Sequence, residues 1–420
     1  EVDPTRQFND LDGDGDLEST DPTGGGILTP LVVRNNPGTV GPDTNYLRYT
    51  GDEHVVLGGT EGADIIIASE GDDTIFGDGG NDTLEGGAGN DIINAGAGDD
   101  IVRDIGGDDN VKLGDGHDAI NTGPGLDLVL GGRGQDFIVL GTDAGSEVFA
   151  GEGNDFILGN ITAERILGNE GDDWIEHGTF DGAPGDNFDE IFAQDGVVGH
   201  DVFFGLGGFD EFIAEGGDDI MVGSPGRAKM AGMSGWDWAI YKDNIAGTDA
   251  DLTRGIVFDE NPTPPPNATQ DAYESVEGLS GSRFNDVLSG SNITAAERAP
   301  FDPDPAISGS EGYTGSNLDA AGIARITGLQ AVVGAGVTSY NAGDIILGGD
   351  GSDLIRGNAG DDIIDGDKWL NVRISVRESV GPNGGVGAEI ATANSMTELV
   401  TRVFNRQINP GQLVIVREIL

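Results

Sequence analysis

Aliphatic residues recur every nine positions along the first part of the chain. They are Ile66, Ile75, Leu84, Ile93, Val102, Val111, Ile120, Val129 and Ile138. Two residues before each stands an aspartate, namely Asp64, Asp73, Asp82, Asp91, Asp100, Asp109, Asp118, Asp127 and Asp136, and two residues before each aspartate stands a glycine. A sequence that keeps three positions in register over so many units predicts a folded repeat rather than a disordered chain.

Each unit has the pattern G-G-x-G-x-D-x-U-x, where U is aliphatic, as in GGAGNDIIN from Gly86 to Asn94. The first six residues favour a turn, and the last three favour a short strand with one inward apolar side chain. We expect two units to form one coil of 18 residues and the strands of stacked coils to pair in parallel. Glycine allows the turns backbone angles that a Cβ atom forbids. The predicted fold class is therefore all-β, a parallel β-roll or β-solenoid.

The same pattern returns in two further parts of the chain. Its aspartates there are Asp155, Asp173, Asp201, Asp210, Asp219 and Asp237, and later Asp344, Asp353 and Asp362. An insert over 177–194 breaks the register, and a further unit ends at Asp286. We divide the chain into an N-terminal segment (1–57), a regular β-roll (58–140), a degenerate repeat block with inserts (141–290), an insertion or linker with a short helix (291–340), a third repeat block (341–367) and a C-terminal segment (368–420).

The C-terminal segment has a different pattern. Apolar and polar residues alternate over 370–377, which predicts a strand. Ser395 and Glu398 form a capping box before an apolar helical stripe that reaches Phe404. A second strand is expected over 413–416. We expect this small α+β segment to cap the solenoid, because an open end needs a cap, or to serve as an interaction surface for another domain.

The charge of the chain is extreme, with 75 acidic and 21 basic residues and a net charge of −54. Such a chain repels itself when compact and has no attraction for nucleic acid or anionic lipid. It contains no cysteine, which excludes disulfides and thiolate metal sites. No apolar run is long enough for a membrane span. Either the chain is disordered or cations neutralise it, and the repeat favours cations.

Calcium is the cation that the repeat predicts. Aspartates 18 residues apart lie on the same side of the roll, about 4.8 Å from one another, and they repel each other unless a cation lies between them. The carboxylates and turn carbonyls offer only oxygen, which suits Ca²⁺ with its six to eight oxygen ligands better than Mg²⁺. All the repeat aspartates named above from Asp64 to Asp237 and from Asp344 to Asp362, except Asp286, are therefore candidate calcium ligands. The alternative is that these aspartates only cap turns.

A second calcium signature lies near the N-terminus. Asp10, Asp12, Asp14 and Asp21 fit the spacing D-x-D-x-D-G-x₅-D, with Gly15 at the sharp turn, and Asp16 lies in the same loop as a further candidate ligand. The segment 10–21 resembles an EF-hand or dockerin-type loop, without clear flanking helices. We expect it to bind Ca²⁺, and the alternative is an acidic flexible loop.

The nonapeptides from Gly58 to Leu140 resemble the repeats-in-toxin (RTX) family, most closely in GDGGNDTLEGGAGNDIINAGAGDD from Gly77 to Asp100. That resemblance implies a parallel β-roll, folding triggered by calcium, and secretion from a bacterium by a type I system to the outside or the cell surface. The chain begins at Glu1 without a leader. We therefore expect it to be processed, a fragment, or exported by a signal elsewhere.

Three stretches also resemble the RTX region of large bacterial animal-type haem peroxidases. They are RYTGDEHVVLGGTEGADIII (Arg48–Ile67), DIGGDDNVKLGDGHDAI (Asp104–Ile120) and GNAGDDIIDGDKWLNVRISVR (Gly357–Arg377). The peroxidase domain implied by this resemblance would lie outside these residues, because no segment matches a haem-ligating motif.

The chain itself shows no catalytic motif. Its four histidines form no H-E-x-x-H site, and neither a G-x-S-x-G elbow nor a P-loop is present. We therefore expect a non-enzymatic calcium-binding roll, and two roles stay open. One is a stabilising scaffold of a secreted peroxidase-like protein. The other is a structural subunit of an extracellular matrix, surface layer, filament or adhesin, whose partners are other copies of the chain.

Overall fold

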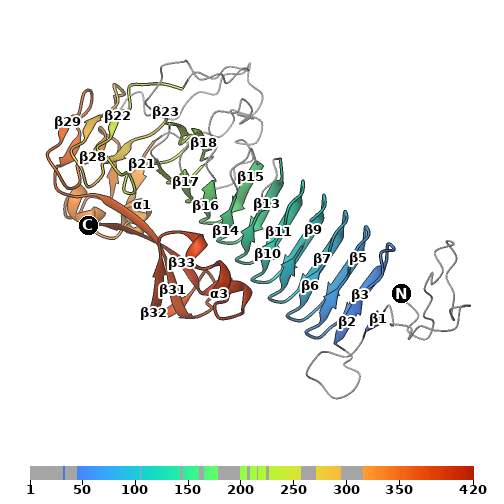
Figure 1. The fold of residues 1–420 in the computed structure, drawn as a ribbon. Coiled ribbons are helices and arrows are strands. Elements are labelled where there is room, and N and C mark those ends of the chain that lie inside the picture. Colours follow the sequence, from blue (N-terminus) through green and yellow to red (C-terminus); the bar gives the residue numbers. More distant parts are fainter. Residues whose placement is uncertain are drawn as a thin grey trace, which may run out of the picture. The chain divides into compact units, whose positions relative to one another are not determined.

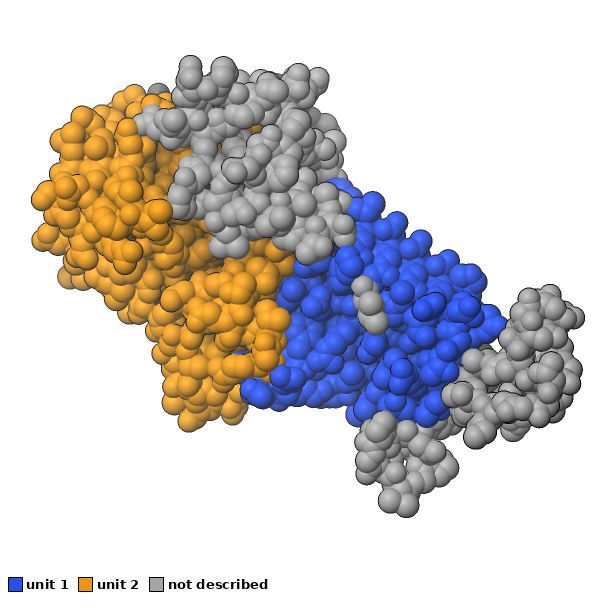
Figure 2. Space-filling view, in the orientation of Figure 1, with its two compact units in different colours: residues 1–152, 165–167, 403–410 blue, residues 153–164, 168–402, 411–420 orange. Residues whose placement is uncertain are grey.

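The computed structural model describes residues 32–33, 45–104, 106–141, 145–159, 165–177, 199–205, 209–214, 216–223, 227–256, 271–294 and 316–420. The EF-hand-like loop with its five aspartates therefore lies outside the described residues. The chain forms two compact units, which Figure 2 colours separately. Unit 1 consists of residues 1–152, 165–167 and 403–410, and unit 2 of residues 153–164, 168–402 and 411–420. Both units are built from parallel strands of a β-solenoid, as predicted.

Unit 1 has two sheets of stacked short strands, seen as the blue and green arrows of Figure 1. One contains β1 (Val32–Val33), β2 (Tyr46–Tyr49), β4 (Ile65–Ile67), β6 (Thr83–Glu85), β8 (Ile101–Arg103), β10 (Ala119–Asn121) and β12 (Phe137–Val139). The other contains β3 (Val56–Thr60), β5 (Thr74–Asp78), β7 (Ile92–Ala97), β9 (Asn110–Asp115), β11 (Leu128–Arg133) and β13 (Glu147–Glu152), with residues 165–167 of β15 (Arg165–Glu170). Except for the β1–β2 pair, neighbouring strands pair in parallel.

The register of these strands confirms the predicted coil. Ile66 pairs with Leu84 and Leu84 with Val102, so each coil takes 18 residues. The nine inward aliphatic residues of the repeat are all buried, with at most 1% of their surface exposed. They form the narrow core between the two sheets.

The turns require glycine at the position two residues before the aspartate. Gly107 has φ +143°, and a Cβ atom there would meet the carbonyl oxygen of Gly89 one coil earlier at less than 3.0 Å. Only glycine permits both this conformation and this close approach of stacked turns.

Unit 2 continues the same design with inserts. Its longest sheet contains β14 (Phe156–Leu158), β16 (Trp174–His177), β17 (Val202–Gly205), β19 (Ile220–Val222), β21 (Trp238–Ile240), β24 (Gly278–Ser280), β28 (Ile345–Leu347) and β30 (Ile363–Asp365). Two further parallel sheets contain β18 (Phe209–Ile213), β20 (Arg227–Ala231) and β23 (Ala272–Glu274), and β22 (Asp249–Asp251), β25 (Val287–Ser289) and β29 (Leu354–Arg356). The inserts leave the pairing intact, since Ile175 pairs directly with Phe203, and Leu279 with Ile346.

The insertion before the last coils holds two short helices instead of the one expected. They are α1 (Ala320–Arg325), which Asp319 caps by accepting a hydrogen bond from the Gly322 amide, and α2 (Leu329–Val333). The antiparallel pair β26 (Leu318–Asp319) and β27 (Ser339–Tyr340) flanks them. Among the described residues no helix combines the length and the apolar character needed to cross a bilayer.

The C-terminal segment is the predicted small α+β element. β31 (Leu370–Ser379) pairs antiparallel with β32 (Val386–Ala393) and with β33 (Leu413–Ile419). Between β32 and β33 lie the 3₁₀ turns Met396–Glu398 and Pro410–Gln412 and helix α3 (Val400–Phe404).

This C-terminal segment contacts the flank of the coils. In unit 2, the Ser395 hydroxyl and the Met396 amide donate to the buried Glu176 carboxylate at 2.7 and 2.6 Å. In unit 1, residues 403–410, here called the tail segment, lie against the roll. Its Arg406 donates to the carbonyl oxygens of Asp82 at 2.6 Å and Asp99 at 3.0 Å.

Candidate metal centre

Two rows of aspartates run along the turns of unit 1. In each row the backbone N–H of one aspartate donates to the carboxylate Oδ1 of the aspartate one coil further on. The first row links Asp64, Asp82, Asp100, Asp118 and Asp136 over distances of 2.7 to 2.9 Å. The second row links Asp73, Asp91, Asp109 and Asp127 over distances of 2.7 to 3.2 Å. The structure thus brings these predicted ligands together in the two rows expected from the 18-residue coil.

A similar row runs through unit 2, although the sequence spacing is irregular. It links Asp155, Asp173, Asp201, Asp219 and Asp237 at 2.6 to 2.9 Å. The step from Asp173 to Asp201 spans 28 residues, whereas the other steps of this row span 18. Near the last coils, the Asp344 amide donates to Asp362 at 2.8 Å, and the Asp286 amide donates to Asp353 at 2.9 Å.

The aspartates of these rows differ in how far they are buried. The row aspartates from Asp64 to Asp237 named above are at most 9% exposed, and so is Asp344. Asp353 and Asp362, in the final coils, are half-buried. Asp210 lies within β18, paired with Ala228, and its side chain is outside the described residues.

The second carboxylate oxygen of these aspartates indicates what the rows lack. The Oδ2 atoms of Asp73, Asp82, Asp91, Asp100, Asp118, Asp173, Asp219 and Asp237 are buried and accept no hydrogen bond. Folded proteins satisfy nearly all buried polar atoms, and a buried charge needs a partner. A row of such oxygens fits a cation that the carboxylates share.

Where the first position of a unit is glycine, the missing side chain leaves room beside the Oδ2 atom of the aspartate. At Gly77 a Cβ atom would lie less than 3.0 Å from Asp82 Oδ2 and from the carbonyl oxygen of Ala95, one coil further on. The same pairing of one carboxylate oxygen and one carbonyl oxygen occurs at Gly59 and Gly131 in unit 1 and at Gly281 and Gly348 in unit 2. The two atoms nearest to the hollow left by the missing side chain are therefore both oxygens, the donor type that Ca²⁺ prefers.

The pKa values of the row aspartates show that ionising these carboxylates is unfavourable without a cation. Burial, helped by repulsion from neighbouring aspartates, raises the pKa of Asp82 and of Asp91 to about 7, and that of Asp118 to about 9. In unit 2, burial and the neighbouring carboxylates raise the pKa of Asp173 and Asp219 well above the usual value. These aspartates resist ionisation at neutral pH unless positive charge lies close to them.

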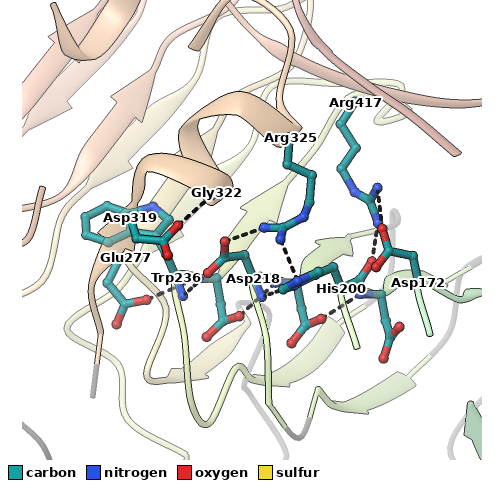
Figure 3. Close-up of polar contacts among 12 residues, drawn as sticks. Asp172, His200, Asp218, Trp236, Glu277, Asp319, Gly322, Arg325 and Arg417 are labelled. Atoms are coloured by element: carbon teal, nitrogen blue, oxygen red, sulfur yellow. Dashed lines mark hydrogen bonds and ion pairs between the residues drawn. The ribbon is translucent and has the colours of Figure 1, made fainter. Parts of the chain in front are cut away.

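Unit 2 supplies some positive charge of its own. Figure 3 shows a second, outer row formed by the residues that precede the buried aspartates. In it, the Asp218 amide donates to His200 Nδ1 at 2.8 Å. Arg325 from α1 pairs with the Asp218 carboxylate at 2.5 Å, and Arg417 from β33 pairs with the Asp172 carboxylate at 3.4 Å. These two arginines partly neutralise the edge of unit 2 without any metal.

Three row members were missed as ligand candidates. Glu277 accepts the amide of Asp237 at 3.1 Å across 40 residues, and Ser146 accepts the amide of Asp127 at 3.1 Å in a coil of 19 residues. Asp286, which was recognised only as a repeat unit, accepts the amide of Thr248 at 2.6 Å. Each stands two residues before a buried aliphatic residue, namely Val148, Leu279 and Leu288. A search for acidic or hydroxyl residues at that place, without a fixed period, would have found all three.

The fold and these rows define a class, the parallel β-roll whose stacked turns carry aspartate ladders. Residues 58–92, 76–103, 105–138, 140–175, 195–227 and 339–368 match the family model of the RTX calcium-binding nonapeptide repeat. The chain thus contains RTX calcium-binding nonapeptide repeats in both units, as the sequence resemblance implied. No curated protein and no solved structure matches the chain.

Proposed function

We propose that this chain is an extracellular, non-enzymatic module that folds when Ca²⁺ fills the aspartate rows after secretion. The observation that carries the proposal is the series of buried Oδ2 atoms without a donor, such as Asp82 Oδ2, which lines the hollow at Gly77 together with the carbonyl oxygen of Ala95. Bound Ca²⁺ supplies the positive charge that removes the repulsion within each row.

The residues that would hold the ions are the row aspartates and the carbonyl oxygens of the first repeat position. In the hollow at Gly77, for example, these are the carboxylate of Asp82 and the carbonyl of Ala95. Asp82 is held in place by the hydrogen bond that its Oδ1 accepts from the Asp64 amide. The turns thus preorganise the ligands, and the ion couples two successive coils.

Folding that depends on calcium suits a secreted protein. Extracellular calcium modules bind at about 10⁻⁴–10⁻³ M, so such sites stay empty at cytosolic calcium concentrations. Without ions, the net charge of −54 opposes compaction. The chain would therefore leave the cell unfolded and fold outside, as the RTX repeats suggest.

A calcium titration of the full chain tests the proposal. Circular dichroism at 215–220 nm and small-angle scattering should show a transition from an expanded chain to a folded roll at about 10⁻⁴–10⁻³ M Ca²⁺. Mg²⁺ at the same concentration is the control and should leave the chain expanded, because Mg²⁺ demands a tight octahedron. A chain that is equally folded in EGTA and in Ca²⁺ contradicts the proposal.

For the larger protein, we propose a scaffold that stabilises a secreted peroxidase-like domain. The three stretches that resemble the RTX region of animal-type haem peroxidases support this role. Haem absorbance near 400 nm in native material that contains this chain would support the link, and native material without haem would contradict it.

Self-assembly is the second candidate role, and one surface favours it. Val56, Phe76 and Ile92 lie on the neighbouring strands β3, β5 and β7 and are 39–53% exposed. Exposed apolar side chains on neighbouring strands suit contact with another copy. Calcium-dependent polymers of the isolated chain in analytical ultracentrifugation would support a filament or surface-layer role, and a monomer at all concentrations would contradict it.

A further inference from the structure

One acidic residue stands where the repeat normally has glycine. The first position of a unit lies five residues before its aspartate, as Gly77 does before Asp82 and Gly86 before Asp91. In the unit of Asp109 this position is occupied by Asp104. The substitution places an additional carboxylate beside the second aspartate row of unit 1.

The three carboxylates converge. One carboxylate oxygen each from Asp91, Asp104 and Asp109 can be chosen so that all lie within 4.8 Å of one another. Asp91 and Asp109 are 1% and 3% exposed, and Asp104 is half-buried. The cluster therefore has two buried aspartates and a third that is partly exposed, although the Oδ2 atom of Asp104 is itself buried.

The hollow at Gly86 shows what the third carboxylate does. A Cβ atom at Gly86 would lie less than 3.0 Å from Asp91 Oδ2 and also from Asp104 Oδ2. At Gly77 the corresponding hollow is lined by one carboxylate oxygen and the carbonyl of Ala95. Ala95 lies one coil after Gly77, and Asp104 likewise lies one coil after Gly86. At Gly86 a charged carboxylate thus takes the place that a neutral carbonyl has elsewhere.

A second observation points to a ligand here. Asp91 Oδ2 is buried and accepts no hydrogen bond, although it faces the hollow. Its Oδ1 is already used, since it accepts the Asp73 amide at 2.7 Å. Three carboxylates at this spacing repel one another strongly, and a divalent cation in the hollow is the partner that all three share.

We propose that Asp91, Asp104 and Asp109 form a three-carboxylate Ca²⁺ site that binds more tightly than the other inter-turn sites and fills first. The inference rests on the proposed function, because it ranks one site within the rows. Calcium affinity rises with the number of charged ligands and with the rigidity of the site. The site thereby becomes the starting point from which the neighbouring coils of unit 1 stack.

The test is a Ca²⁺ titration of the full chain by isothermal calorimetry, with Asp104→Asn and Asp104→Gly as variants. In the wild type, one site should bind about tenfold or more tightly than the remainder. Both variants should lose that tight class and keep the remaining sites. Asp104→Gly restores the usual residue of the repeat, so its fold at saturating Ca²⁺ should be retained in circular dichroism. Asp115→Asn on β9, an exposed aspartate, is the matched control.

A variant that should gain a tight Ca²⁺ site provides an independent test. Ala95 holds the first position of the unit of Asp100, one coil after Gly77, whose hollow Asp82 Oδ2 lines. Ala95→Asp should create a second tight site with Asp82 and Asp100, so the calorimetric stoichiometry of the tight class should double.

The outcomes separate the two proposals. If the wild type binds no Ca²⁺, the proposed function itself fails. If the wild type binds Ca²⁺ and folds, but Asp104→Asn gives a superimposable titration, only the three-carboxylate site is refuted.

Discussion

Asp82→Asn should change the stability of the roll in opposite directions with and without calcium. In the structure, Asp82 Oδ1 accepts the Asp64 amide at 2.7 Å, whereas Oδ2 has no donor and faces the Ala95 carbonyl. Asparagine keeps the first hydrogen bond. Its amide group replaces the charged Oδ2 and can donate towards the carbonyl.

The magnitude follows from the pKa of Asp82, which burial raises from 3.8 to about 7. This difference of about 3 units corresponds to about 4 kcal/mol at about 1.36 kcal/mol per unit. Because the pKa is raised in the folded state, the penalty is absent below pH 3.8 and complete above pH 7. At pH 8 without metal, Asp82→Asn should therefore stabilise the fold by up to about 4 kcal/mol. With Ca²⁺, the same change removes a charged ligand and should destabilise the fold.

The assay needs both conditions. In EGTA at pH 8, folding is driven by trimethylamine oxide, and the variant should need less of it than the wild type. In 10 mM Ca²⁺, urea unfolding should show a lower midpoint for the variant. Asp115→Asn, an exposed control, should change neither midpoint. A loss of stability in both conditions would refute the reasoning, since it would mean that the carboxylate stabilises the fold without any cation.

Three further outcomes are expected. In EGTA the roll should become more compact on acidification from pH 8 to pH 5. Burial raises the pKa of Asp91 to about 7 and that of Asp118 to about 9, so protonation favours the folded state. Small-angle scattering that shows expansion instead would contradict this. Arg406→Gln should weaken the tail segment by about 1.5–3 kcal/mol, the usual contribution of a charged hydrogen bond, and hydrogen exchange over 403–410 should accelerate while the core strands stay protected. Gly89→Ala should lower the melting temperature in Ca²⁺, since Gly89 has φ +129° and a Cβ would approach the Gly71 carbonyl to less than 3.0 Å, whereas Gly58→Ala, with open space around it, should have little effect.

The repeat made much of the fold predictable. A period of nine specifies which residues turn, which point inward and which aspartates share an edge, because all these contacts are local to one coil and the next. Ile66, Leu84 and Val102 therefore pair as the sequence indicates.

Prediction became difficult where contacts span inserts. The partner of Asp237 is Glu277, 40 residues on, and the partner of Asp286 is Asp353, 67 residues on. A fixed period cannot find such pairs, since the number of residues between two stacked strands varies from coil to coil. Asp104 does not follow from the repeat pattern for another reason, because it stands at a position that the pattern assigns to glycine, which has no side chain to add a ligand.

The tail segment makes contacts between residues that are far apart in the sequence. Neighbouring coils are linked by contacts between residues 18 apart, so the coils can stack one after another. Arg406 reaches the carbonyl of Asp82 across 324 residues and that of Asp99 across 307. Closing so long a loop is entropically slow compared with adding a coil. Folding should therefore show two kinetic phases, a rapid growth of the roll followed by a slower closure in which the end of the chain returns to a region near its beginning.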